Sequence, residues 1–222
     1  MFAKSYFVAF VILLSASSSL LSQSYWESSL SYGVAVYHGD MTREFLSTKD
    51  INPAAQLSLN RHFDKQHAVR LNLLYGSISG NDSYDNSLSK RGNAFTANVF
   101  EASIIGQIDL IGDQRFSKHV GFKRTLTPYF FVGAGVIFAD PKVRYGDPNN
   151  RDAAIDYPIV HIFAPVGGGL KYDLSLKTYI GLEAAIRFTT SDYLDGVQAS
   201  GNAYNNDGYI FTGLTVGYRF IN

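Results

Sequence analysis

The 222-residue sequence contains no cysteine, which excludes a disulfide framework, a lipidated N-terminal cysteine and zinc sites built on thiolates. It also lacks a net charge, because 19 Lys and Arg residues balance 19 Asp and Glu residues. No overall field therefore favours a nucleic acid or an acidic ligand, and we expect no nucleic-acid partner. No segment has the periodicity of a long helix, so we expect strands and loops throughout the mature chain.

The N-terminus lacks an apolar run long enough to cross a membrane as a helix. Its apolar residues run only from Tyr6 to Leu14, after the single cation Lys4, whereas a spanning helix needs about 17 residues or more. Small residues follow, as in a secretory signal peptide. We expect a cleaved signal peptide over residues 1–22, with cleavage after Ser22 preferred and a competing site at residues 16–18. Residues 23–222 then form a single barrel domain.

The sequence is rich in Tyr (15), Phe (16) and Gly (20), arranged in segments where apolar residues alternate with small or polar ones. The alternation is clearest near the C-terminus, where Ile210, Leu214 and Phe220 share one face. The eight alternating segments are residues 25–37, 53–63, 67–78, 93–111, 127–139, 159–172, 178–189 and 207–220. Roughly a dozen residues exceed the mean globular strand but match a tilted membrane crossing. The sequence predicts an all-β fold, an eight-stranded antiparallel up-and-down transmembrane β-barrel.

The face opposite the apolar one distinguishes a membrane barrel from a soluble one. A soluble eight-stranded barrel such as a lipocalin also alternates, but its outer face would carry many Lys, Glu and Thr. Here that face is mostly Gly, Ala, Ser and Asn, which fits a narrow lumen filled by its own side chains. The few charges on this face must then pair with one another or with trapped water. The predicted ionic network of the lumen comprises Glu27, Arg70, Glu101, Asp109, Lys171, Glu183, Arg187 and Arg219.

Two details of this arrangement follow from the same pattern. Glu27 and Arg219 are the first expected pair, because the first and last strands become neighbours when a barrel closes. In segment 127–139 the outward face stays open, because Phe130 and Val132 compete with Tyr129 and Phe131.

Catalytic and metal-binding motifs are lacking as well. The five histidines have no spacing typical of a metal motif, so we expect no metal and no cofactor. His161, near Ser and Glu residues, could mimic a membrane-embedded esterase, but no motif places a nucleophile beside its base. The run Gly167-Gly168-Gly169 lies within a strand rather than before a helix, which argues against a phosphate loop. We therefore predict a protein that is not an enzyme.

A series of short motifs occurs in order along the mature chain. The motifs are Tyr25-Trp26-Glu27, Tyr37-His38-Gly39-Asp40, residues 75–82 (YGSISGND), Phe100-Glu101-Ala102-Ser103, residues 128–135 (PYFFVGAG), residues 165–172 (PVGGGLKY), Asp192-Tyr193-Leu194-Asp195 and the closing strand. In this series the chain resembles the small outer-membrane barrel family that includes PorG of type IX secretion and related barrels of unknown function. It departs from the usual pattern in Ile221-Asn222, which follow the terminal aromatic residue, and in residues 140–157.

The resemblance implies a bacterial outer-membrane protein that helps to assemble or anchor a secretion machine, with outer-membrane lipid and periplasmic secretion-system proteins as partners. If both termini are periplasmic, the unusually basic stretch 112–126 is a periplasmic connection. The candidate partner contacts there are Arg115, Lys118, Lys123 and Arg124. Three other functions stay open at this point, namely a membrane-embedded lipid hydrolase, a narrow pore and a soluble lipocalin-like carrier.

Overall fold

The computed structural model describes residues 24–39, 50–84, 92–111, 122–147, 159–190, 193–196 and 207–221. The expected signal peptide, residues 1–22, lies outside the described residues. Among the described residues no helix is both long enough and apolar enough to span a membrane.

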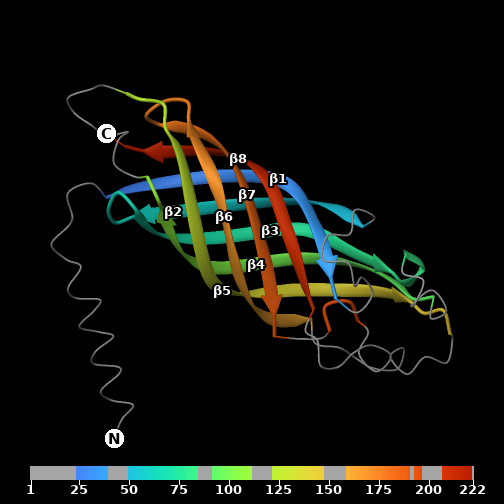
Figure 1. The fold of residues 1–222 in the computed structure, drawn as a ribbon. Helices are drawn as coiled ribbons and strands as arrows, with labels where there is room; N and C mark the ends of the chain where they lie inside the picture. Colours follow the sequence, from blue (N-terminus) through green and yellow to red (C-terminus); the bar gives the residue numbers. More distant parts are fainter. Residues whose placement is uncertain are drawn as a thin grey trace, which may run out of the picture.

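Eight antiparallel strands form one closed barrel, as the alternating sequence predicts (Figure 1). Each strand pairs with its neighbours along the chain, and β1 pairs with β8 to close the barrel. The strands are β1 (Tyr25–His38), β2 (Ile51–His62), β3 (His67–Asn81), β4 (Ala94–Asp109), β5 (Leu126–Arg144), β6 (Val160–Asp173), β7 (Thr178–Thr189) and β8 (Gly208–Phe220), with a short 3-10 turn, η2 (Asp82–Tyr84), after β3.

The barrel has two different ends. The end at which β1 begins and β8 ends is called here the terminal end, and its connections are residues 63–66, 110–125 and 174–177. The opposite end, called here the loop end, has the connections 39–50, 82–93, 145–159 and 190–207, each of at least 12 residues. In Figure 1 the start of β1 and the arrowhead of β8 lie together at the terminal end.

Side chains alternate strictly between lumen and exterior along the strands. Most exterior positions are apolar, and many are strongly exposed, as at Leu214 (71 %) and Tyr32 (68 %). In the described strands, ionisable Lys, Arg, His, Asp and Glu side chains face outward only near strand ends. The sequence did not determine which face of β5 points outward. In the structure Phe130 and Val132 face outward, while Tyr129 and Phe131 are buried in the lumen.

Two strands extend by three or more residues beyond the segments that the sequence pattern predicts. β3 continues to Asn81 rather than ending at residue 78, and β5 continues to Arg144 rather than ending at residue 139. Ala94, the first residue of β4, pairs with Asn81 on one side and with Arg144 on the other, so β3 and β5 reach the same level as β4 at the loop end. A backbone ladder needs no apolar side chains, and the apolar alternation therefore stops before the hydrogen bonding does.

Candidate functional site in the barrel lumen

Glu27 is the centre of an ionic network in the half of the lumen nearer the terminal end. Its Oε1 accepts hydrogen bonds from Asn60 Nδ2 (2.9 Å), Lys171 Nζ (3.0 Å) and Tyr179 Oη (2.9 Å). Its Oε2 accepts one from Arg219 Nε at 3.1 Å. These four donors come from β2, β6, β7 and β8, so one carboxylate on β1 connects strands from much of the circumference.

Arg219 and Lys171 extend the network on either side of Glu27. Arg219 Nη2 donates to Asp173 Oδ1 at 2.7 Å, and Lys171 Nζ lies 3.5 Å from Asp109 Oδ2. Asp109 Oδ1 in turn accepts a hydrogen bond from Gln107 Nε2 at 2.6 Å. The pair expected first from the sequence, Glu27 with Arg219, is therefore an ion pair at the seam between β1 and β8.

Glu183 holds the next part of the network. Arg70 Nη1 and Tyr129 Oη each donate to its Oε2 at 2.7 Å, and Gln56 Nε2 donates to its Oε1 at 2.8 Å. Arg70 also donates to Gln107, which links this part to the Glu27 part. A charge-assisted hydrogen bond is stronger than a neutral one, so this arrangement compensates the buried charges.

The network ends at Arg187 and Glu101, near the middle of the lumen. Arg187 Nη2 donates to Gln56 Oε1 at 3.0 Å and its Nη1 donates to Ala185 O at 3.1 Å. Glu101 is buried, yet neither of its carboxylate oxygens has a hydrogen-bond partner, and its ion-pair contact is with Arg187 Nε at 3.5 Å. Glu101 is thus held in the network by an ion pair alone.

Tyrosine rings separate the cations of the network. Lys171 Nζ lies 5.0 Å from the centroid of the Tyr129 ring and 5.3 Å from that of Tyr179, while the Arg219 guanidinium lies 4.7 Å from the Tyr179 ring. Such cation–π contacts add stabilisation where charges are removed from water. The Tyr179 ring needs the glycine at position 217, since a Cβ there would overlap the ring. Aromatic rings thus fill the space between the charged side chains and stabilise the ionic network.

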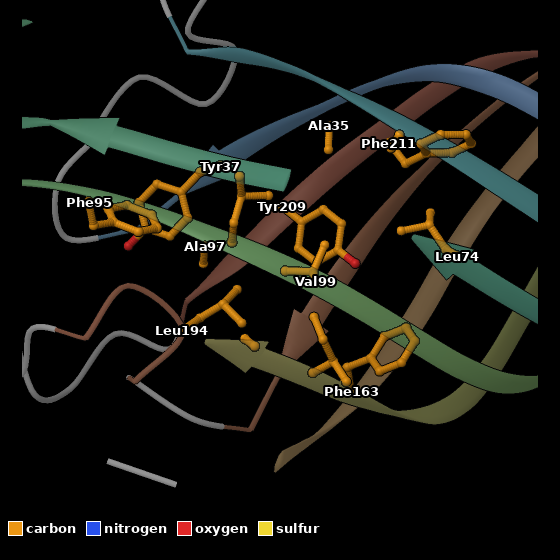
Figure 2. Close-up of a cluster of buried hydrophobic side chains, with 14 residues drawn as sticks. Ala35, Tyr37, Leu74, Phe95, Ala97, Val99, Phe163, Leu194, Tyr209 and Phe211 are labelled. Atoms are coloured by element: carbon orange, nitrogen blue, oxygen red, sulfur yellow. The ribbon is translucent and has the colours of Figure 1, made fainter. Parts of the chain in front are cut away.

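The half of the lumen nearer the loop end is filled in a different way. A cluster of buried apolar side chains occupies it, and most of its members are labelled in Figure 2. The cluster consists of Ala35, Tyr37, Ala54, Leu74, Ile78, Phe95, Ala97, Val99, Ile137, Ala139, Phe163, Leu194, Tyr209 and Phe211, with Val143 and Tyr145 packed against it. In Figure 2, side chains from several strands point toward one another, and Leu194 joins them from outside the strands.

The segment 193–196 is held in the mouth of the barrel by polar contacts. Tyr37 Oη lies 2.8 Å from Asp195 Oδ2 and 2.6 Å from Asp207 Oδ1, and Leu194 N donates to Asp207 Oδ2 at 3.0 Å. Gly196 has a φ of 75°, a left-handed conformation that suits glycine, and its carbonyl accepts a hydrogen bond from Tyr145 Oη at 3.3 Å. Leu194 is thereby fully buried at the loop end.

The structure places all eight residues of the predicted ionic network in the lumen and links them into one series of contacts. The sequence pattern did not identify the bridging residues Gln56, Gln107 and Asp173, nor His62, whose Nε2 lies 3.6 Å from Glu27 Oε2. Gln56 and Gln107 lie on the predicted inner face, and this position is the sequence feature that could have identified them as lumen residues. Asp173 was expected in a turn, but it is the last residue of β6 and is buried.

The predicted partner contacts form a separate set. Arg115 and Lys118 lie outside the described residues. Lys123 and Arg124 are exposed just before β5, at the terminal end. They are therefore not part of the lumen network.

The arrangement offers no catalytic geometry among the described residues. His161 faces the lumen and is buried, and its Nε2 has no hydrogen-bond partner. In the part of the chain that the structure describes, no three His, Asp or Glu side chains gather as metal ligands. The carboxylates and cations of the lumen contact one another, as expected of charged groups that serve to hold the barrel together.

A comparison with proteins of curated function gives no match. Among solved structures, the barrel resembles Ail, the attachment invasion locus protein of Yersinia pestis, at 12 % identity and a TM-score of 0.47, over 89 % of this chain and 99 % of that one. It resembles OprG from Pseudomonas aeruginosa at 9 % identity and a TM-score of 0.45, over 92 % and 100 % of the two chains. The outer membrane enzyme PagL matches at 15 % identity and a TM-score of 0.42, over 88 % and 98 %. At these identities and TM-scores, no function transfers to this chain. Residues 4–222 match the model described as Domain of unknown function (DUF6089), and the chain therefore belongs to that family.

Proposed function

We propose that the protein is a non-enzymatic barrel of the bacterial outer membrane with a structural or interaction role. The observation that carries this proposal is the exterior of the barrel. Over the central part of every described strand the outward side chains are uncharged, and large apolar residues such as Ile104 and Tyr75 are about three-fifths exposed, at 62 % each. An apolar surface this extensive requires lipid, and a closed barrel leaves no strand edge unpaired in it.

The other functions fit these observations less well. A lipocalin-like carrier would present a polar exterior to water. A narrow pore needs a continuous polar path, whereas the loop-end half of this lumen is filled by the apolar cluster. A lipid hydrolase needs a nucleophile beside its base, and His161 Nε2 bonds to no such group. We therefore expect little or no conductance in planar bilayers and no release of acyl chains from lipid.

Membrane insertion tests the proposal directly. Tyr218 and Phe220 face outward at the end of β8 and their rings pack edge to face, with centroids 5.1 Å apart. Replacing both with Ala should impair insertion, measured as the fraction of heat-modifiable protein in the membrane. Tyr172→Ala, which removes an outward aromatic from β6 at the same end, is the matched control and should insert nearly normally. Recovery of the mature wild-type protein in the soluble periplasm would overturn the proposal.

The finer form of the proposal is a role in type IX protein secretion, which the resemblance to PorG supports. In this form a periplasmic protein contacts the basic connection between β4 and β5, where Lys123 and Arg124 are exposed. Reversal of Lys118, Lys123 and Arg124 to Glu should abolish co-purification of a secretion-system protein and reduce secretion. A loop-end control, Lys142→Glu with Arg144→Glu, should leave both unchanged. If the triple variant co-purifies the same proteins and secretes normally, this role is wrong while the membrane barrel stands.

A further inference from the structure

Aromatic residues and cations gather on the outer surface at the terminal end, across four adjacent strands. Here they are called the rim patch, which consists of Trp26, Arg61, Phe63, Lys177, Tyr218 and Phe220. Register places Trp26 beside Phe220 on β8 and beside Arg61 on β2. Lys177 O accepts a hydrogen bond from Arg219 N at 2.7 Å, which fixes the turn before β7 next to the end of β8.

Among the described residues, an aromatic ring and a hydroxyl orient Arg61, and no carboxylate does. Its guanidinium carbon lies 5.2 Å from the centroid of the Trp26 ring, and its Nη2 donates to Ser24 Oγ at 3.0 Å. Trp26 is 44 % exposed, so the pair of Trp26 and Arg61 lies at the surface. A cation in contact with an exposed aromatic ring near the end of a strand is the arrangement expected where a barrel passes from acyl chains to headgroups.

The charge of the whole chain hides an asymmetry between the two ends. The three connections at the terminal end contain six Lys and Arg but two Asp and Glu. The four connections at the loop end contain five Lys and Arg but eleven Asp and Glu. The terminal end is thus the basic end, by four charges, and it holds the rim patch.

We infer that the rim patch binds the phosphate groups of anionic phospholipids. The inference rests on the proposed location in a membrane and adds a lipid preference to it. Arg61 and Lys177 flank the aromatic side chains at the level where the uncharged exterior ends, and anionic headgroups attract cations held at this depth. The β4–β5 connection, with Lys123 and Arg124, is a different surface on other strands and is assigned to a protein partner.

Trp26 is the single tryptophan of the chain, so its fluorescence reports on the patch itself. The purified barrel is inserted into phosphatidylcholine vesicles with a fixed fraction of phosphatidylglycerol, and either lipid is brominated on its acyl chains in separate samples. At equal mole fraction, brominated phosphatidylglycerol should quench Trp26 about twofold more strongly than brominated phosphatidylcholine at low salt, and the ratio should fall toward one at high salt. Arg61→Gln with Lys177→Gln should bring the ratio close to one at low salt too.

Two control variants locate the effect. Lys142→Gln with Arg144→Gln alters the loop end, and Lys123→Gln with Arg124→Gln alters the terminal end away from the patch; both should keep the wild-type ratio. Equal quenching by the two brominated lipids in the wild type overturns this inference but leaves the proposed function standing. A loss of preference in the Lys123/Arg124 variant as large as in the Arg61/Lys177 variant also overturns it, because the preference would then belong to the whole end. Absence of quenching by either lipid shows that the barrel is not in the bilayer, and then the proposed function fails.

Discussion

In the terminal half of the lumen Glu27 accepts hydrogen bonds from four other strands, whereas in the loop half Phe211 and Ile78 are buried within an apolar cluster. Both halves occupy the same narrow barrel, and both must be filled. The ionic half is filled by a few long side chains whose charges fix their directions. The apolar half is filled mainly by the shapes of its side chains, and directional contacts occur at its mouth, where Tyr37 bonds to Asp195 and Asp207.

The difference has an energetic consequence. In the ionic half each charge is tolerated only because its partners are present, so the loss of one group leaves others buried and uncompensated. In the apolar half a truncation loses only the transfer free energy of the deleted atoms and the cost of the remaining cavity. The two halves should therefore respond differently to substitution, to salt and to pH.

The largest effect is expected at the centre of the ionic half. Glu27→Gln removes the charge that compensates Lys171 and Arg219, and should lower the free energy of unfolding by about 3 to 5 kcal/mol. Urea unfolding in vesicles, followed by Trp26 fluorescence and by heat-modifiability, measures the loss. The change keeps the side-chain volume, so a cavity does not account for it.

Glu101→Gln is the matched control for this prediction, because Glu101 is equally buried but has no hydrogen-bond partner at either oxygen. It should cost clearly less than Glu27→Gln. Equal losses in the two variants would mean that the number of hydrogen bonds does not set the energy of this network.

A smaller effect is expected in the apolar half. Ile78 is fully buried, and Ile78→Ala should destabilise by about 3 kcal/mol while Ile78→Val costs about 1 kcal/mol. The losses should be the same at low and high salt, because no charge is involved. A marked salt dependence of the Ile78→Ala loss, measured by the same urea titration, would contradict the distinction between the two halves.

The sequence predicts the ionic half far better than the apolar half. Strand alternation identifies inward positions, and a charge at such a position, as at Arg70 or Glu183, is conspicuous against small residues. The partners remain uncertain, because they depend on barrel register. Gln56 shows this limit, since a neutral amide on the inner face gives no sign that it bridges Glu183 and Arg187.

In the apolar half the two faces of a strand look alike in sequence. Ile137 in β5 belongs to the apolar cluster while its neighbour Phe138 faces outward, and composition alone could not separate them. Leu194 belongs to a segment without any alternation, and its packing depends on contacts to Tyr37 and Asp207 that are distant in the chain. Such contacts follow from the closed barrel, which brings the ends of β1 and β8 together.

The smallest effect is expected at Asp64, an ionic group outside both halves. The carboxylate lies in the turn between β2 and β3, where partial burial raises its pKa but hydrogen bonds from the backbone N–H groups of His67 and Gln66, both 2.7 Å, outweigh this and lower it. Because the pKa is lower in the folded state, the stabilisation is present above the unfolded pKa and is lost as the pH falls through the folded pKa. Asp64→Asn should therefore cost less than about 1 kcal/mol at neutral pH, and nothing at a pH where Asp64 is already protonated. Urea midpoints of the wild type and the variant across an acid pH series measure this convergence. A loss as large as that of Glu27→Gln would show that burial does not separate the lumen charges from those of an exposed turn.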